Sequence, residues 1–134
     1  MNTTEILRRY VDAWNGHDVA VLVGNFTKDA TYYSPHTYPG VNMENLAEFA
    51  KGLWASFPDF SVELINVGEI EPGVGATHWL VRGTNTGPGA DGSDPTGRAI
   101  SVKGASIIQI EGDKLRSETA YFDPNLMQEQ LATK

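Results

Sequence analysis

The chain has 134 residues, a net charge of −7 and no cysteine. This length suits one domain with one core, so a single domain is expected over residues 1–134. The acidic charge repels phosphate backbones and anionic lipid heads, which argues against nucleic acid and membrane surfaces as partners. The missing thiols exclude disulfides, thiol catalysis and zinc sites built on cysteine.

The N-terminal sequence indicates the start of a helix rather than a signal peptide, since no apolar stretch follows Met1–Tyr10. No apolar run approaches the length that is needed to span a bilayer. A cytoplasmic location is therefore the expectation.

The first half of the chain is predicted to be mainly helical. Apolar residues recur at helical spacing over 6–14, with Asn2 as a cap and Gly16 as a stop. Asp18 can cap a second, shorter helix whose apolar positions run as far as Phe26. A short strand is expected around Thr31–Ser34, followed by an irregular loop to Gly40.

The clearest predicted helix begins after Asn42 and is closed by Pro58. It carries one apolar stripe, formed by Leu46, Phe49, Leu53, Trp54 and Phe57. We expect this stripe to face a sheet built from the second half of the chain.

The second half reads as strands separated by turns. Strands are predicted at Phe60–Leu64, Ala76–Thr84, Ala99–Ile110 and Leu115–Asp123, with a short tail helix from Leu126. Helices that come first and antiparallel strands that follow are typical of an α+β domain. A curved sheet under a helical layer leaves room for one cavity between the layers.

Two glycine- and aspartate-rich patterns have simpler explanations than ligand binding. The segment Gly87–Gly92 matches G-x-G-x-x-G, but a strand rather than a helix follows it and Pro95 interrupts it. A flexible hairpin loop is the better interpretation. Asp91 and Asp94 lack the further ligands of a calcium loop, so solvated loop charge is expected.

None of the three histidines has metal-ligand spacing, and neither a metal nor a cofactor is predicted. His17 lies at a helix junction and is expected to be structural. His78 lies on a predicted strand, and its side chain could lie either on the surface of the sheet or in the pocket. His36 lies in the aromatic loop that follows Tyr32, and loops carry function more often than strands do, which makes it a candidate ligand contact.

Asp123 is the carboxylate of most interest, because it ends an apolar strand directly before Pro124. One reading makes it the cap of the tail helix. The other makes it a carboxyl whose aromatic neighbours, Tyr121 and Phe122, desolvate it and raise its pKa, which suits proton transfer near neutral pH. The residues alone leave both readings open.

Short motifs recur in a fixed order along nearly the whole chain. They occupy Tyr10–Asp18 (with AWNGHD), Asp29–Pro35, Arg82–Gly87 (with GTNTG), Thr96–Arg98 (TGR) and Gly112–Asp123 (from GDKL to YFD). Together they resemble the SnoaL-like polyketide cyclases, whose fold is the nuclear-transport-factor-type α+β cone. Two positions depart from the family pattern. Asn85 stands where the family often has histidine, and Gln109 stands near a second polar catalytic position.

The resemblance implies a cone around one pocket for a small apolar molecule. It implies a cofactor-independent acid/base enzyme, a cyclase, isomerase or related lyase, acting on a carbonyl compound. By position Asp123 matches the family's catalytic aspartate. His36 is the second residue that we expect to take part in catalysis. The residues expected to bind substrate are Tyr33, Trp54, Trp79 and Tyr121. The resemblance also implies a homodimer.

Two other function classes remain open. One is a non-catalytic carrier that uses the same cavity for a small apolar ligand. The other is a scaffold whose sheet only mediates protein contacts, and it predicts a cavity that is filled by side chains.

Overall fold

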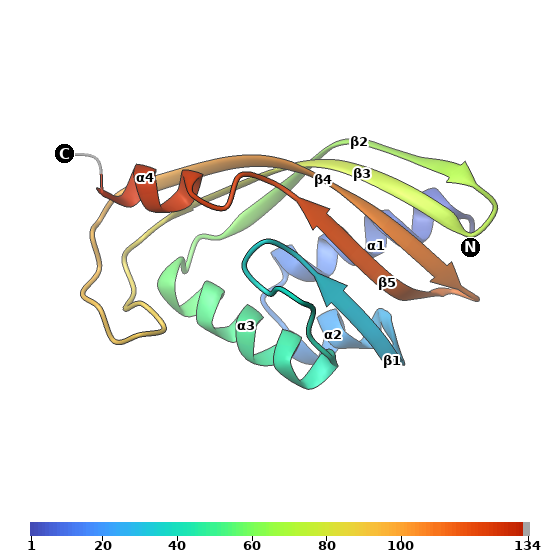
Figure 1. Ribbon diagram of the computed structural model, residues 1–134, viewed down its shortest axis with the longest axis horizontal. Coiled ribbons are helices and arrows are strands. Elements are labelled where there is room, and N and C mark those ends of the chain that lie inside the picture. The colour runs from blue at the N-terminus through green and yellow to red at the C-terminus, as the bar shows by residue number, and fades with distance from the viewer. Residues whose placement is uncertain (133–134) are drawn as a thin grey trace.

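The computed structural model, which describes residues 1–132, has one curved sheet with the N-terminal helices on its concave side (Figure 1). In chain order the elements are α1 (Thr3–Asn15), α2 (Val19–Gly24), β1 (Phe26–Tyr33), α3 (Met43–Ser56), β2 (Ser61–Glu71), β3 (Val74–Thr84), β4 (Ala99–Glu111), β5 (Lys114–Tyr121) and α4 (Leu126–Ala132). This is the predicted α+β architecture. None of the described helices is long and apolar enough to cross a membrane.

The sheet has five strands in the order β1-β5-β4-β3-β2. The pairs β2–β3, β3–β4 and β4–β5 are antiparallel, which confirms the predicted pairing of the three long strands. The parallel pair β1–β5 was not predicted. It forms because the chain leaves β1, lays down α3 and three strands, and returns with its last strand beside the first. The sheet is not closed.

Helix α1 begins as expected with a reciprocal capping box. The Asn2 side chain accepts from the Glu5 amide at 2.8 Å, and the Glu5 carboxylate accepts from the Asn2 amide at 3.0 Å. The prediction that the second helix reaches Phe26 was wrong. That helix ends at Gly24, and Phe26 opens β1, where its buried ring packs edge-on against Tyr10 at 5.2 Å.

The apolar stripe of α3 faces inward as predicted. Leu46, Trp54 and Phe57 are buried in the core. Phe49 and Leu53 are partly buried and line the cavity between the layers. Some residues of the stripe pack against the core and others face the cavity, so α3 forms part of both the core and the pocket wall.

Helix α4 occupies an edge of β4 that β5 leaves free. Pairing with β5 stops at Ala105, so the first half of β4 lacks a strand on that side. The Gln130 side chain takes that place: its oxygen accepts from the Ser101 amide and its nitrogen donates to the Ser101 carbonyl, each at 2.8 Å. These two bonds hold the predicted tail helix against β4, and Met127 of that helix reaches the pocket.

The glycine-rich segment after β3 is a loop, as expected, and no helix opens at its end. Asn85 organises it. Its side-chain nitrogen donates to the carbonyls of Ser56 and Gly87, and its oxygen accepts from the backbone and hydroxyl of Thr96. Gly87 lies so close to α3 that a Cβ there would be 1.7 Å from the Ala55 carbonyl oxygen. Asn85 therefore has a structural role in place of the histidine that is frequent in the family.

Candidate active site

A pocket with a cavity volume of about 110 Å³ lies between the concave face of the sheet and helices α1 and α3. A single water needs about 10–15 Å³ by the same measure, so the cavity admits a small organic ligand or part of a larger one. Its walls are mainly apolar, and their aromatic part includes Trp14, Phe49, Phe60, Trp79 and Phe122. Among the described residues, no lysine or arginine lines it.

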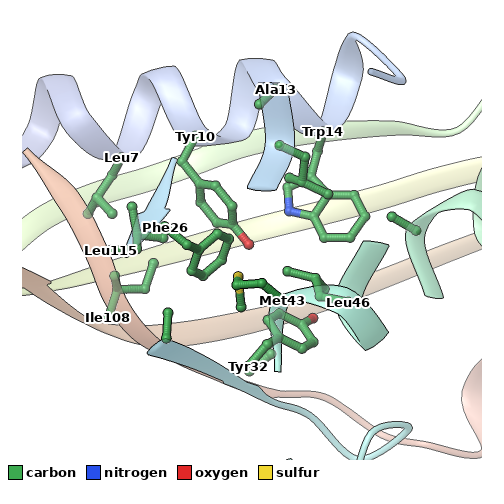
Figure 2. Packing of buried hydrophobic residues seen from close by; sticks show 14 of the residues in the cluster. Leu7, Tyr10, Ala13, Trp14, Phe26, Tyr32, Met43, Leu46, Ile108 and Leu115 are labelled. Atoms are coloured by element: carbon green, nitrogen blue, oxygen red, sulfur yellow. The ribbon is translucent and has the colours of Figure 1, made fainter. Parts of the chain in front are cut away.

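Glu118 of β5 is the one carboxyl buried in this wall, with 6% of its surface exposed. The Tyr10 hydroxyl, from α1, donates a hydrogen bond to Glu118 Oε1. Tyr32 of β1 brings a second buried phenol to the same region. In Figure 2 the rings of Tyr10 and Tyr32 enter the interior from different elements, with Trp14 close to the Tyr10 hydroxyl.

Burial raises the pKa of the Glu118 carboxyl above its ordinary value of 4.5, because the apolar wall disfavours the charged form. Hydrogen bonds from the hydroxyls of Tyr10 and Ser106 oppose that rise. Burial, and then the charge of Glu118, raise the pKa of both Tyr10 and Tyr32 above 10.0. The phenols therefore stay protonated near neutral pH and can donate, while Glu118 is a carboxyl that holds its proton more tightly than an exposed glutamate does.

Asp123 lies at the exposed rim of the pocket, beyond the end of β5. Its Oδ1 accepts from the Asn125 amide at 2.9 Å, in the turn that leads into α4. Asp123 thus fixes the entry to the tail helix, as the first sequence reading proposed, and it also reaches the pocket, but it lacks the burial that the second reading required. Aromatic neighbours do not bury it, because the chain has left the sheet at this point.

His36 also lies at the rim of the pocket, in the loop that follows β1. Its ring packs edge-on against Phe122 at 5.1 Å, and Nε2 lies 3.0 Å from the Pro124 carbonyl oxygen. A carbonyl can only accept, so Nε2 carries the hydrogen and a neutral ring keeps Nδ1 as its acceptor. The structure thus brings His36, Asp123 and Trp79 to one pocket, as the sequence suggested.

The other three predicted substrate contacts do not line the pocket. Tyr33 and Tyr121 are 40% and 61% exposed, because the inward positions of their strands are held by neighbours such as Tyr32 and Ala120. Trp54 is buried behind the wall, where it packs against Trp14 at 5.9 Å and stacks on His17 at 5.2 Å. In the described part of the chain, Trp54 Nε1 has no hydrogen-bond partner.

The remaining positions singled out in the sequence lie outside the pocket. His17 is structural, as expected, with Nε2 donating to the Phe60 carbonyl at 2.8 Å. His78 is on the exposed side of β3, 3.2 Å from Asn66 Oδ1. Gln109 is also exposed and accepts from the Ser117 hydroxyl. Within residues 1–132 no group of three or more His, Asp or Glu side chains could hold a metal ion.

The buried group of Glu118, Tyr10 and Tyr32 was not identified from the sequence. One signal was present: Glu118 is in phase with Ala120 and Phe122 along the last strand, so all three share the inner face. Strand alternation could not identify Tyr10, the hydrogen-bond partner of Glu118. Tyr10 is 108 positions away in the chain and belongs to an apolar helical stripe that reads simply as core.

Comparison with protein families gives one match, to the model described as SnoaL-like polyketide cyclase, over residues 4–131. The chain belongs to the SnoaL-like polyketide cyclase family. No curated protein sequence matches it. Family membership agrees with the motifs that the sequence carries in order from Tyr10 to Asp123.

Solved structures resemble the whole chain. A candidate polyketide cyclase from Pseudomonas putida KT2440 has a TM-score of 0.85 at 18% identity and covers 98% of this chain and 99% of its own. IdmH from Streptomyces antibioticus, also a candidate polyketide cyclase, has a TM-score of 0.84 at 19% identity and covers 99% and 100%. An NTF2-like protein of unknown function from Cytophaga hutchinsonii has a TM-score of 0.67 at 13% identity, covering 93% of each chain. At these identities the likeness shows the fold, which is the NTF2-like cone.

Proposed function

We propose that this SnoaL-like protein is a cofactor-independent acid/base enzyme acting on a small apolar carbonyl compound, with Glu118 as its proton carrier. The observation that carries the proposal is the Glu118 carboxyl, buried in an apolar pocket wall and bound by the Tyr10 hydroxyl. A carboxyl that is desolvated in a ligand-sized pocket is typical of groups that move protons. The reaction would be a cyclisation, an isomerisation or a related elimination.

The chemistry follows from the groups present. Ionised Glu118 would take a proton from carbon next to the ligand's carbonyl, and the electron pair would move onto the carbonyl oxygen as an enolate. In an isomerisation the carboxylic acid formed would return the proton to a different carbon. In a ring closure the enolate carbon would bond to the carbon of a second ketone, the C=O π electrons would move onto that ketone's oxygen, and the carboxylic acid would protonate this oxygen. The protonated phenol of Tyr32 suits stabilisation of the enolate, since donors in a dry site stabilise developing charge strongly, whereas the single proton of Tyr10 is already donated to Glu118. A carbonyl with acidic neighbouring protons would need no metal or cofactor.

A second arrangement, with Asp123 as the acid/base and His36 beside it, stays a prediction. It is supported by the position of both residues on the pocket rim and by the bond of His36 Nε2 to the Pro124 carbonyl, which orients the ring. Glu118 is favoured over Asp123 because its apolar surroundings, rather than water, determine its proton affinity. The two arrangements assign the same kind of chemistry to a buried and to an exposed carboxyl of one pocket.

An experiment in heavy water separates the enzyme from the carrier. A panel of polyketide esters, ketosteroids and simple 1,3-dicarbonyl compounds is incubated with the protein in D₂O, and deuterium at carbon is followed by mass spectrometry. The proposal expects at least one panel member to exchange or rearrange faster than in buffer alone. Binding of several members without exchange would contradict it and favour the carrier.

We also propose that the outer face of the sheet pairs with a second copy of the chain. Ile107 and Tyr121, 39% and 61% exposed, lie diagonally across the β4–β5 pair on this face. Light scattering should give twice the 14.6 kDa monomer mass at micromolar concentration, and Ile107→Asp should reduce it to the monomer. A wild-type mass near 14.6 kDa would contradict the dimer.

A further inference from the structure

We propose that Trp79 and Ser106 are positioning residues for Glu118, so that the pocket wall itself controls the orientation and protonation of this carboxyl. The inference rests on the role proposed for Glu118. The Trp79 indole lines the pocket, and its Nε1 donates to Ser106 Oγ at 3.0 Å. Ser106 has none of its surface exposed, so water cannot replace either partner of its hydroxyl.

Strand register places Ser106 beside Glu118. On the β4–β5 pair Ser106 is opposite Ala120 and Glu118 is opposite Ile108, so Ser106 and Glu118 are diagonal neighbours on the inner face. A hydroxyl has one proton. Because the indole N–H occupies an acceptor site on Ser106 Oγ, the hydroxyl is oriented with its own proton free to donate to Glu118, which is the bond that lowers the pKa of that carboxyl.

Gly104 makes this arrangement sterically feasible. It is opposite Trp79 on the β3–β4 pair, and a Cβ at position 104 would be 2.3 Å from Trp79 Cη2 and 2.5 Å from Cζ2. The indole can therefore lie across the backbone of β4 and reach the next inward position, which is Ser106. A side chain at position 104 would force the ring away.

A parallel connection runs through α1. Trp14, also in the pocket wall, lies one helical turn after Tyr10 and lowers the pKa of that phenol, and Tyr10 donates to Glu118. Figure 2 shows the Trp14 indole nitrogen on the side of its ring that faces the Tyr10 hydroxyl. Each of the two hydroxyls that act on Glu118 thus has a tryptophan of the pocket wall as a neighbour, and a ligand would touch both indoles. A ligand that moves either indole would change the proton affinity of Glu118.

Other titratable groups near Glu118 are few. Tyr10 faces it from α1 and Tyr32 from β1, and both stay protonated in the range where Glu118 titrates. His36 and Asp123 lie at the exposed rim. The sheet contributes neutral polar groups only: Thr77 lines the pocket, and Ser106 lies buried behind its wall. A change in the titration of Glu118 can therefore be attributed to its hydroxyl donors.

The test uses NMR titration of the whole protein. The three indole N–H signals are followed with pH together with the carbon-13 signal of the Glu118 carboxyl. Trp79 and Trp14 should shift with the midpoint of Glu118, whereas Trp54, whose Nε1 has no partner within residues 1–132, should not. In Glu118→Gln the shared transition should vanish. A Trp79 signal that stays flat while Glu118 titrates would overturn the inference without any variant.

Ser106→Ala gives the second measurement. Loss of a donor to the charged form should raise the Glu118 midpoint by about one pH unit, and Trp79→Phe should raise it less, because Ser106 can still donate. A purely structural role predicts lower stability with the midpoint unchanged, which would overturn the inference. The proposed function fails separately, if Glu118→Gln leaves turnover intact while the midpoint still responds to Ser106→Ala.

Discussion

Glu118→Gln is expected to lower turnover of any accepted substrate by about 10²–10⁴-fold, the usual cost of losing general acid/base assistance. Glutamine is nearly isosteric with glutamate and its oxygen can still accept the Tyr10 hydroxyl, so the bond between α1 and β5 should survive. The amide cannot exchange a proton in this pH range. Ligand affinity should therefore change far less than turnover, and both are measured on the same preparation.

Asp123→Asn is the matched control, since it makes the same chemical change at the rim. Asparagine keeps the side-chain oxygen that accepts from the Asn125 amide, so the entry to α4 should hold. We expect turnover within a few-fold of the wild type. The reverse result, with Asp123→Asn inactive and Glu118→Gln active, would transfer the catalytic role to the rim and to His36.

Ile108→Ala is expected to lower the free energy of unfolding by about 2–5 kcal/mol. Ile108 has none of its surface exposed and lies on β4 in the core below the pocket. The loss combines the transfer free energy of the missing atoms with the cavity that they leave, and it is large against a typical stability of about 5–15 kcal/mol. Urea unfolding followed by tryptophan fluorescence measures it.

Ile70→Ala provides the control for this experiment, because it is the same substitution on another strand. Ile70 is 58% exposed near the end of β2, so its truncation should cost less than about 1 kcal/mol. Equal losses for the two variants would show that burial of Ile108 does not determine its contribution.

Patterns that repeat along one element predicted most of the fold. The capping box at Asn2, the stripe on α3 and the alternation of the long strands all act between near neighbours in the sequence, and the structure has each of them. Two features depend instead on where distant segments come together. The parallel pairing of β1 with β5 and the early end of α2 both result from packing of the first strand against the rest of the core.

The site shows the same division. Asp123 stood out in the sequence because Tyr121 and Phe122 precede it, but alternation turns Tyr121 outward and β5 ends before Asp123. Glu118 stood out less, since Ser117 and Thr119 on either side make that stretch look polar and solvated. Its burial comes from Tyr10, which is brought over the sheet by α1.

The most direct measurement of the central claim is the carbon-13 titration of the Glu118 carboxyl in the unmodified protein. A midpoint above 4.5, the ordinary value for glutamate, is predicted, because burial outweighs the two hydroxyl donors. The direction of this pKa shift also determines how the free energy of unfolding depends on pH. A raised pKa favours the folded state at low pH, and that contribution is lost as the pH rises through the folded-state midpoint. The stability of Glu118→Gln relative to wild type should therefore increase over the same interval. A midpoint at or below 4.5 would show a solvated or fully paired carboxylate and would contradict the assignment of Glu118 as the proton carrier.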